Sequence, residues 1–503
     1  MKILTCSEMQ ALEAQSFQAG LKPVTLMQRA VEGMLGDWKR RFPRPGQAIF
    51  FCGKGNNGND GLWLADCLVH LGWQVEIVTS HPAEERKEVS CQAVQHALST
   101  AKVWSSLAFC SNPSFSLKKH PRIIVDALLG LGSSDSPHGV CLEMLEAMRS
   151  LKSQASMSVS IDLPSGLDPQ TGIPSPDTFP ADLTYSLGFM KHCLLMDVAR
   201  PYVGRLQVIA LDLEKYVEAN NTDLNADFFT LQEARNLTKQ LTAETYKGKR
   251  GTLHCWAGSE SMRGAAQLVS HSGLRSGAGL VRLYSHSSLS SPILPSCPEI
   301  ITGTLSSKAI PQTFMEAKAW VLGPGIGVDE ESLRILTKLL EQAPCPIVLD
   351  ADALSLVACD LPILNACAQP IILTPHRGEL ERLLHQPAPE RQEAASLWLQ
   401  QHPQTILVAK GPNTLVAAQN QTYSFNASGN PGMATAGMGD VLAGMIGSLL
   451  AQGYAPWDAA RLGVYWHGKA ADHAVEKLGE QCLTASDVLS SVAPAWKKIS
   501  NQD

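Results

Sequence analysis

An aspartate that follows a run of glycines is the residue of this chain best placed to do chemistry. Residues 429–440 read GNPGMATAGMGD and lead directly into the apolar segment 441–450. This pattern predicts a glycine loop that feeds a helix, and the free N–H groups of a first helical turn bind anions. A carboxylate beside a bound phosphate is unfavourable unless it takes a proton from the attacking group. Asp440 is therefore the first catalytic candidate, and the alternative is that it only caps the helix.

A second glycine-rich stretch, GKGNNGNDG at 53–61, lies between a predicted buried strand at 48–52 and a predicted helix through Leu68. Strand, glycine loop and helix in this order are typical of phosphate-binding sites. The Asn and Asp oxygens suit a sugar, an amide or a monovalent cation. No acid ends the following strand, 74–79, so the partial G-x-G-x-x-G pattern does not favour a dehydrogenase. An Asn-rich turn without a ligand is the bland alternative.

Acids end two further predicted strands of the first half. The strand 122–126 ends at Asp126, and the strand 157–162 ends at Asp162, just before Pro164-Ser165-Gly166. Ligands of parallel α/β sheets bind beyond the carboxyl ends of the strands. We therefore expect these acids and the Asn-rich stretch to form one site, although a strand-end Asp bonded to its own turn would look the same in sequence.

Further loops follow predicted strands in the second half. They begin after the strands 252–257, 320–322, 346–349, 370–373 and 405–409. His376 lies in the fourth of these loops and Lys410 begins the fifth. There is no Walker A motif, so a P-loop nucleotidase is not favoured. Strands alternating with helices predict a doubly wound α/β sheet in each half.

Bulk properties bound the possible functions. A chain of 503 residues predicts two domains, and the polar run 218–223 places the boundary near 222, giving domains 1–222 and 223–503. A net charge of −6 does not favour nucleic-acid or anionic-membrane partners. The 13 cysteines are scattered without a C-x-x-C pair, which fits a reducing cytoplasm better than disulfides or zinc. With no signal peptide or long apolar run, we expect a soluble cytoplasmic protein.

The second half resembles the ribokinase-like superfamily through its Gly-x-Gly-Asp sequence at 437–440, and residues 430–435 resemble the NAD(P)H-hydrate dehydratase branch. The resemblance covers roughly 245–495 and implies that Asp440 is a base and that Mg²⁺ and ADP or ATP take part. Met438 stands where many relatives have Thr. The residues implied to meet the hydrated nicotinamide are Ala265, Gly325, Gly327, His376 and Asp440. Those implied to line the nucleotide are Lys410, Gly411, Pro412, Asn413, Thr414 and Gly439.

The first half, roughly 1–215, resembles the NAD(P)H-hydrate epimerase domain through its three strand-end loops. The resemblance implies a Rossmann-like three-layer sandwich, in which Asn57, Asp126 and Ser165 hold K⁺. Asp162 is the acid/base candidate for the carbon that bears the 6-hydroxyl. Asn59 stands where the family usually has glycine. The residues implied to contact the substrate are Asn56, Asn57, Gly58, Asn59, Asp60, Gly130, Leu131, Gly132, Ser133, Ser134, Asp135, Ser136 and Asp162.

Together, the two resemblances predict a bifunctional enzyme that repairs NADHX and NADPHX, the water adducts of NADH and NADPH. One half interconverts the R and S epimers, and the other dehydrates the S form at the expense of a nucleotide phosphate. We also expect a homo-oligomer. The alternative is a vitamin or sugar kinase preceded by a noncatalytic nucleotide-binding module.

Overall fold

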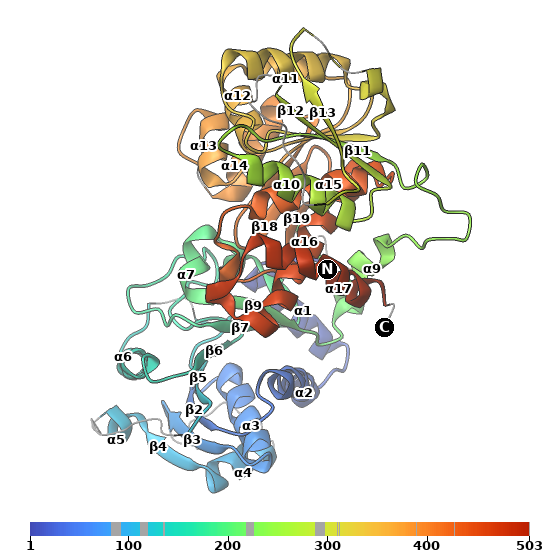
Figure 1. Ribbon diagram of the computed structural model, residues 1–503. Helices are drawn as coiled ribbons and strands as arrows, with labels where there is room; N and C mark the ends of the chain where they lie inside the picture. Colours follow the sequence, from blue (N-terminus) through green and yellow to red (C-terminus); the bar gives the residue numbers. More distant parts are fainter. Residues whose placement is uncertain are drawn as a thin grey trace. The chain divides into compact units, whose positions relative to one another are not determined.

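Two compact units make up the chain. The computed structural model describes residues 1–81, 92–110, 119–133, 136–217, 226–286, 297–308, 310, 312–388, 390–426 and 428–501. The units span Met1–Asn225 and Ala226–Asp503, and each has its own main sheet (Figure 1). The polar run 218–223, on which the predicted boundary rests, lies outside the described residues. No described helix is long and apolar enough to cross a membrane.

The first unit is built on a seven-stranded sheet in which every neighbouring pair is parallel. The strand order is β4-β3-β2-β5-β6-β7-β9. Chain order reverses between β2 and β5, which makes their carboxyl ends the expected ligand position. The strands are β2 (Gln47–Cys52), β3 (Gln74–Thr79), β4 (Lys102–Ser105), β5 (Arg122–Ala127), β6 (Met157–Ile161), β7 (Leu183–Leu187) and β9 (Arg205–Ile209).

Helices cover both faces of this sheet. Successive side chains of a strand point to opposite faces, so Ala48 and Phe50 of β2 join one core cluster while Ile49 and Phe51 join the other. The first cluster includes side chains of the first four helices, and the second includes those of α5 and α6. The predicted three-layer sandwich is confirmed. The helices are α1 (Cys6–Gln18), α2 (Pro23–Arg41), α3 (Asn56–His70), α4 (Gln92–Thr100), α5 (Ser106–Cys110), α6 (Val140–Lys152), α7 (Arg200–Val203) and α8 (Glu214–Val217).

A separate pair of short parallel strands ties the start of the chain to the middle of this unit. β1 (Ile3–Leu4) pairs with β8 (Met190–Lys191), and Leu4 lies opposite Lys191. Thr5 then begins α1 through a capping box with Glu8, which satisfies two backbone donors and fixes where the helix starts. The first helix is thereby set beside the strand that carries Lys191.

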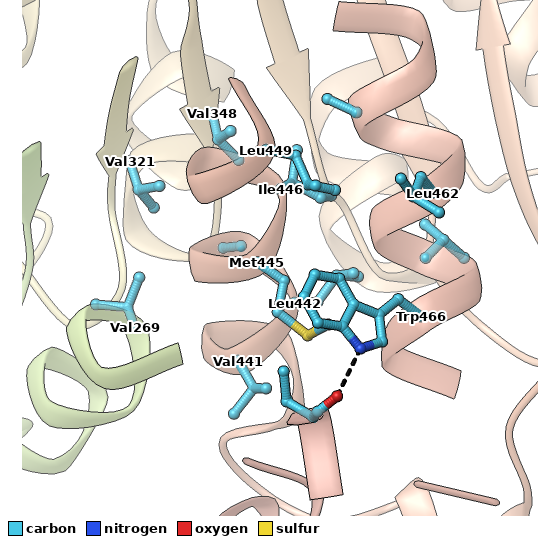
Figure 2. Packing of buried hydrophobic residues seen from close by; sticks show 14 of the residues in the cluster. Val269, Val321, Val348, Val441, Leu442, Met445, Ile446, Leu449, Leu462 and Trp466 are labelled. Atoms are coloured by element: carbon cyan, nitrogen blue, oxygen red, sulfur yellow. Dashed lines mark hydrogen bonds between the residues drawn. The ribbon is translucent and has the colours of Figure 1, made fainter. Parts of the chain in front are cut away.

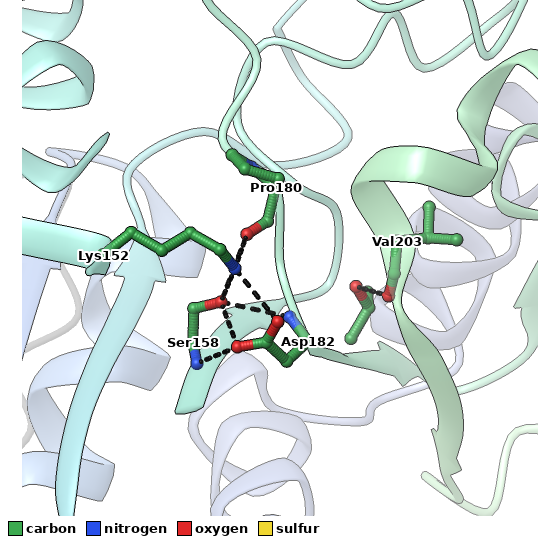
Figure 3. Close-up of polar contacts among 6 residues, drawn as sticks. Lys152, Ser158, Pro180, Asp182 and Val203 are labelled. Carbon is green, nitrogen blue, oxygen red and sulfur yellow. Dashed lines mark hydrogen bonds and ion pairs between the residues drawn. The ribbon is translucent and has the colours of Figure 1, made fainter. Parts of the chain in front are cut away.

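A polar network fixes the amino ends of β6 and β7, opposite the ligand edge (Figure 3). Lys152 Nζ donates to Ser158 Oγ and to the Pro180 carbonyl, each at 2.6 Å, and to Asp182 at 3.0 Å. The Asp182 carboxylate also accepts the Ser158 N–H at 2.7 Å. Because each group has several partners, the network holds α6 and the two strands in one arrangement.

The second unit has a ten-stranded sheet in the order β10-β19-β18-β17-β16-β15-β14-β11-β12-β13. Its neighbours are parallel except for β17 with β18 and β18 with β19. Chain order reverses between β11 and β14. The strands are β10 (Ala226–Phe228), β11 (Thr252–Trp256), β12 (Leu280–His286), β13 (Ile301–Leu305), β14 (Ala319–Leu322), β15 (Ile347–Leu349), β16 (Ile371–Leu373), β17 (Thr405–Ala409), β18 (Thr414–Ala418) and β19 (Tyr423–Asn426).

The core of the second unit is centred on α15 (Met438–Ala451), which is apolar on every side and therefore buried. Figure 2 shows its side chains among Val269 of α10, Val321 of β14 and Trp466 of α16. The indole N–H of Trp466 donates to the Val492 carbonyl at 2.8 Å. The other helices are α9 (Leu231–Leu237), α10 (Arg263–Arg275), α11 (Glu330–Gln342), α12 (Asp352–Cys359), α13 (Arg377–Leu384), α14 (Arg391–Gln401), α16 (Pro456–Leu478) and α17 (Ala485–Ser500). The prediction of two doubly wound α/β units is confirmed.

Candidate active sites

A cavity of about 560 Å³ lies beyond the carboxyl ends of β2, β5 and β6, at the reversal of strand order. A smaller hollow of about 390 Å³ shares Gly130 and Ser133 with it. Ser134 and Asp135 lie outside the described residues. Among the expected substrate contacts of the first half, those that line the larger cavity are Asn56, Asn57, Asp60, Gly130, Leu131, Gly132, Ser133, Ser136 and Asp162.

The Asn-rich stretch is helical from residue 56, which corrects the expectation of a loop through residue 61. Gly55 is the N-cap of α3. A Cβ on Gly58 would lie 1.9 Å from the Gly53 carbonyl oxygen, and one on Gly53 would lie 1.9 Å from that of Leu128. Because these two residues have no side chain, the first turn of α3 approaches the ends of β2 and β5 more closely than other residues would allow.

Gly58 and Asn59 are not among the residues that line the cavity. Both are buried. Their expected contact with substrate therefore finds no support in this geometry. Asn59 lies in the regular part of α3 and is not among the residues with positive φ. An asparagine in place of the usual glycine thus creates no backbone strain here.

Asp126 and Ser165, two of the expected K⁺ ligands, are in direct contact. Asp126 is 0% exposed, and its carboxylate accepts the Ser165 N–H at 2.8 Å and hydroxyl at 2.6 Å. It also accepts the Leu128 N–H at 3.2 Å and the Ser160 hydroxyl at 3.0 Å. Burial raises the pKa of Asp126, and these hydrogen bonds offset only part of the increase.

Asn57, the third expected ligand, is linked to the same group through Leu129. Its Nδ2 donates to the Leu129 carbonyl at 2.8 Å, and the Leu129 N–H donates to Ser165 Oγ at 3.0 Å. The buried Oδ1 of Asn57 has no hydrogen-bond partner among the described residues. An orphaned amide oxygen linked to a hydroxyl and a carboxylate is a donor set that fits a hard monovalent cation.

Asp162 directly follows β6 with a φ of +69°, a conformation uncommon outside glycine. Its carboxylate forms an ion pair with Lys191, whose side chain is 0% exposed, and accepts the Leu187 N–H at 3.4 Å. The turn after Asp162 bonds instead to Asp126, through the Ser165 N–H. The alternative of a strand-end Asp bonded to its own turn therefore does not hold. Backbone strain and a buried ion pair beside a cavity are typical of a functional site.

Two more carboxyl groups, Glu13 of α1 and Asp60 of α3, line the same cavity. Burial, and after it the Asp162 carboxylate, raises the pKa of Glu13 to about 7, although Lys191 lowers it. Burial, Asp162 and Glu13 together raise the pKa of Asp60 well above its usual range. The cavity is thus lined by three acids, Glu13, Asp60 and Asp162, and the buried Lys191 lies behind it, paired with Asp162.

In the second unit, Asp440 lies in the first turn of α15. The N-cap of this helix is Gly437, with a φ of +86°, so the alternative that Asp440 only caps the helix does not hold. Burial and then the Asp350 carboxylate raise the pKa of Asp440 to about 7, while Lys410 lowers it. A carboxyl group with a pKa near neutrality is well matched to proton transfer.

Lys410, at the end of β17, lies between acids from the two preceding strands. Its Nζ is 2.6 Å from Asp350 Oδ1, after β15, and 3.8 Å from Glu379 Oε2, on the helix after β16. Burial lowers the pKa of Lys410, but these carboxylates raise it by more. A Cβ on Gly439 would lie 3.1 Å from Lys410 Nζ. The fold therefore brings together Lys410 and Gly439, which were both expected to line the nucleotide.

The glycine turn after β14 packs against the start of α10. Gly325 has a φ of +67°, and a Cβ there would lie 2.6 Å from Met262 Cβ and 3.3 Å from Ala265 Cβ. The Gly327 N–H donates to Asp352 Oδ2 at 2.9 Å. Ala265 and Gly325, expected to meet the hydrated nicotinamide, thus lie close together with Gly327 two residues on, and a side chain at Gly325 would clash with Met262.

His376 begins α13 as its N-cap, which the sequence had shown only as a loop position. Its ring Nδ1 accepts a hydrogen bond from the Glu379 backbone N–H at 3.3 Å, and the His376 backbone N–H donates to Glu379 Oε2 at 2.8 Å. Burial and then Lys410 lower the pKa of His376, which favours the neutral ring. The expected nucleotide contacts that remain form the tight turn between β17 and β18: Gly411, Pro412, Asn413 and Thr414.

Both halves match models of known families. Residues 24–193 match the model described as YjeF-related protein N-terminus, and residues 253–494 match that of NAD(P)H-hydrate dehydratase. A bifunctional NAD(P)H-hydrate repair enzyme of Coxiella burnetii is 33% identical over 487 residues, covering 96% of this chain and 96% of that protein. The chain belongs to the bifunctional NAD(P)H-hydrate repair enzymes.

Solved structures resemble the second unit of this repair-enzyme chain. A hypothetical protein of Streptococcus mutans is 25% identical, with a TM-score of 0.50, over 55% of this chain and 100% of that protein. An ADP/ATP-dependent NAD(P)H-hydrate dehydratase of Bacillus subtilis, co-crystallised with ATP and Mg²⁺, is 30% identical, with a TM-score of 0.49, over 55% of this chain and 99% of that protein. The second unit has a doubly wound α/β fold, and its residues 253–494 match the dehydratase family model, as the sequence resemblance implied.

Several charged residues that the fold of this repair enzyme brings into the two sites were not predicted from the sequence. Asp350 and Glu379 were visible in strand-end loops but received no role. A lysine inside the apolar segment Gly188–Leu195 is a signal that could have revealed Lys191. Glu13 gives no such signal, because a carboxylate on a half-exposed helix is ordinary in sequence.

Proposed function

We propose that this chain performs both steps of NAD(P)H-hydrate repair. The first unit interconverts R- and S-NAD(P)HX, and the second dehydrates the S form with ADP or ATP. The observation that carries the proposal is Asp440, with a pKa of about 7, in the first turn of a glycine-led helix beside Lys410. Such a helix start binds phosphate, and the adjacent carboxyl group accepts a proton from the phosphate acceptor.

In the second unit, the 6-hydroxyl of the substrate attacks the terminal phosphate of the nucleotide while Asp440 takes its proton. The first-turn amides of α15 and the ammonium group of Lys410 stabilise the charge on the transferred group. The ring-nitrogen lone pair then expels phosphate, and loss of a proton from the adjacent ring carbon restores the dihydronicotinamide. Asp350 and Glu379 offer the carboxylate oxygens that Mg²⁺ prefers, and Mg²⁺ would neutralise phosphate charge there.

In the first unit, Asp162 is proposed as the acid/base group for epimerisation of the carbon that bears the hydroxyl. Lys191 supplies the counter-charge to its carboxylate. Asn57, Asp126 and Ser165 would hold K⁺, which would screen negative charge of the substrate and order the strand-end loops. The orphaned Asn57 Oδ1 supports this assignment. We further propose a cytoplasmic location, which the free thiols of the described cysteines suit, and a homo-oligomeric state.

Incubation of an R/S mixture of NADHX with Mg²⁺ and either ADP or ATP tests the proposal. Repair restores the dihydronicotinamide absorbance and releases inorganic phosphate together with AMP or ADP. A vitamin or sugar kinase would instead leave the absorbance unchanged and pass the phosphate to another acceptor. Running the two nucleotides in parallel also measures which one the second unit prefers.

A further inference from the structure

Helix α1 reaches the epimerase cavity although it precedes residues 24–193, the part that matches the first family model. Gln10, Glu13 and Phe17 of this helix line the cavity. The Gln10 Nε2 donates to the Leu131 carbonyl at 2.8 Å, which ties the helix to the loop after β5. Glu13 is the carboxyl group that this helix presents to the cavity.

The start of the chain is anchored so that Glu13 lies near the Asp162–Lys191 pair. Leu4 of β1 pairs with Lys191 of β8, and Cys6 at the start of α1 contacts Cys193 with the sulfur atoms 3.6 Å apart. These contacts join α1 to the segment that carries Lys191. The electrostatics are consistent with this proximity, because the charges of both Asp162 and Lys191 change the pKa of Glu13.

We propose that Glu13 is the second proton-transfer group of the first unit, acting as general acid while Asp162 acts as base. This inference rests on the epimerase activity proposed above. Lys191 compensates the charge of Asp162, whereas burial and that same negative charge favour the neutral form of Glu13. Two carboxyl groups in such unequal surroundings take opposite roles in proton transfer.

The reaction balances with these two groups alone. The ring-nitrogen lone pair expels the hydroxyl oxygen, the C–O bond breaks with its electron pair on oxygen, and the Glu13 proton joins that oxygen to release water. Water then adds to the other face of the iminium carbon and gives its proton to Asp162. Exchange of one proton with solvent then returns Glu13 to its acid form and Asp162 to its carboxylate form. The reverse reaction uses the same groups in exchanged roles, so no oxidant, reductant or co-substrate is needed.

The proposal makes the rate depend on pH in a defined direction. Glu13 has a pKa of about 7, so the fraction that carries the acidic proton falls as the pH rises above neutrality. The kcat/KM of epimerisation should therefore fall about tenfold per pH unit well above that point. The charged and titratable groups around Glu13 are Asp60, Asp162 and Lys191, and Lys54, His81 and His138 also line the cavity.

The test uses the full chain and pure S-NADHX without nucleotide, and chromatography follows the appearance of the R epimer across the neutral pH range. Glu13→Gln should lower kcat about 100-fold, change KM only severalfold and lose the decline above neutrality. Glu13→Asp should keep part of the activity and the decline. Glu32→Gln, an exposed carboxylate of α2, is the matched control and should behave as wild type.

The outcomes distinguish the role of Glu13 from the epimerase activity of the first unit. A wild-type kcat/KM without a decline above neutrality, or a Glu13→Gln variant with wild-type kcat and pH profile, overturns the role of Glu13 alone. A wild-type chain that never forms the R epimer overturns the proposed epimerase function instead. If Glu13→Gln keeps nucleotide-dependent dehydration and normal thermal unfolding, its loss of epimerase activity does not reflect misfolding. If that variant fails to fold, the pH profiles of the wild type and of Glu13→Asp decide whether Glu13 is the acid.

Discussion

Each unit pairs a lysine with an aspartate at the ligand edge of its sheet: Lys191 with Asp162, and Lys410 with Asp350. Removing two charges from water costs several kcal/mol per ion, and pairing regains this only with good geometry. Buried pairs with perturbed neighbours are accordingly enriched at functional sites. In each unit the pair acts on the pKa of a further carboxyl group. Asp162 raises the pKa of Glu13 and Lys191 lowers it, and in the same way Asp350 raises the pKa of Asp440 and Lys410 lowers it.

We predict that Asp440→Asn abolishes dehydration, with a loss of about 100-fold or more, because the amide keeps the shape but accepts no proton. Nucleotide binding should stay within severalfold of wild type. In the wild-type chain, kcat/KM should rise with pH through about 7, as the carboxylate form of Asp440 becomes populated. Steady-state kinetics on S-NADHX checks both, and a variant with more than about a tenth of wild-type turnover would show that Asp440 is not the base.

We also predict that K⁺ supports epimerisation and that Asp126→Ala removes this dependence together with most of the activity. The substitution deletes the carboxylate that organises Ser165 through two hydrogen bonds. Epimerisation rates measured with K⁺, with Na⁺ and without either ion test the assignment. Equal wild-type rates in all three buffers would mean that Asn57, Asp126 and Ser165 serve structure only.

At the residue scale, the sequence revealed those candidates that stand beside glycines or at strand ends. Asp440 and Asp162 were recognised in this way. The structure excludes helix capping as the role of Asp440 and a hydrogen bond to its own turn as the role of Asp162. Glu13, Lys191 and Asp350 were not assigned roles, because their pairing joins segments far apart in the chain. Such contacts depend on strand order and register, which local sequence patterns do not contain.

At the scale of elements, the second unit depends on close packing between α10 and α15. A Cβ on Gly444 of α15 would lie 2.0 Å from Ser272 Oγ and 2.2 Å from the Val269 carbonyl oxygen of α10. A Cβ on Gly447 would lie 2.4 Å from a methyl group of Val321 in β14. The glycines of α15 therefore let one helix lie directly against a second helix and the sheet.

We predict that Gly444→Ala destabilises the second unit by about 2 kcal/mol, because the added methyl group overpacks the α10–α15 contact. Urea unfolding, followed through hydrogen exchange of α15, measures the effect. Gly264→Ala is the matched control, since Gly264 lies in α10 and a Cβ there meets nothing within 4 Å. That control should be neutral or slightly stabilising, and equal stability of the two variants would contradict the packing argument.

Strands that form long apolar runs were predicted, whereas the interior strand β7 was missed, because its buried sequence LTYSL contains two polar residues. Strands such as β2 and β15 are buried along their whole length, so they appear as continuous apolar runs. The edge strands β4 and β13 were not predicted, because most of their residues are exposed and alternate too weakly to give a signal. The start of α3 was placed too late, since asparagine and glycine favour turns when read in isolation.

At the scale of the molecule, each unit has the means to fold without the other. Among the described residues, two core clusters of the first unit draw only on residues 4–217, and a core cluster of the second unit draws only on residues 229–499. The residues proposed for epimerisation likewise lie in the first unit and those proposed for dehydration in the second. The stretch 218–225 joins the two units.

We therefore predict that a chain cut near residue 222 yields two active pieces. The second piece alone should dehydrate pure S-NADHX at the full-length rate but stall on an R/S mixture once the S form is consumed, apart from slow spontaneous epimerisation. Adding the first piece should restart the reaction, since it converts the remaining R form. Dihydronicotinamide absorbance over time records both phases.

If the second piece alone consumed both epimers at the full-length rate, the first unit would not be the epimerase. If that piece were folded yet inert on the pure S form, dehydration would require residues of both units.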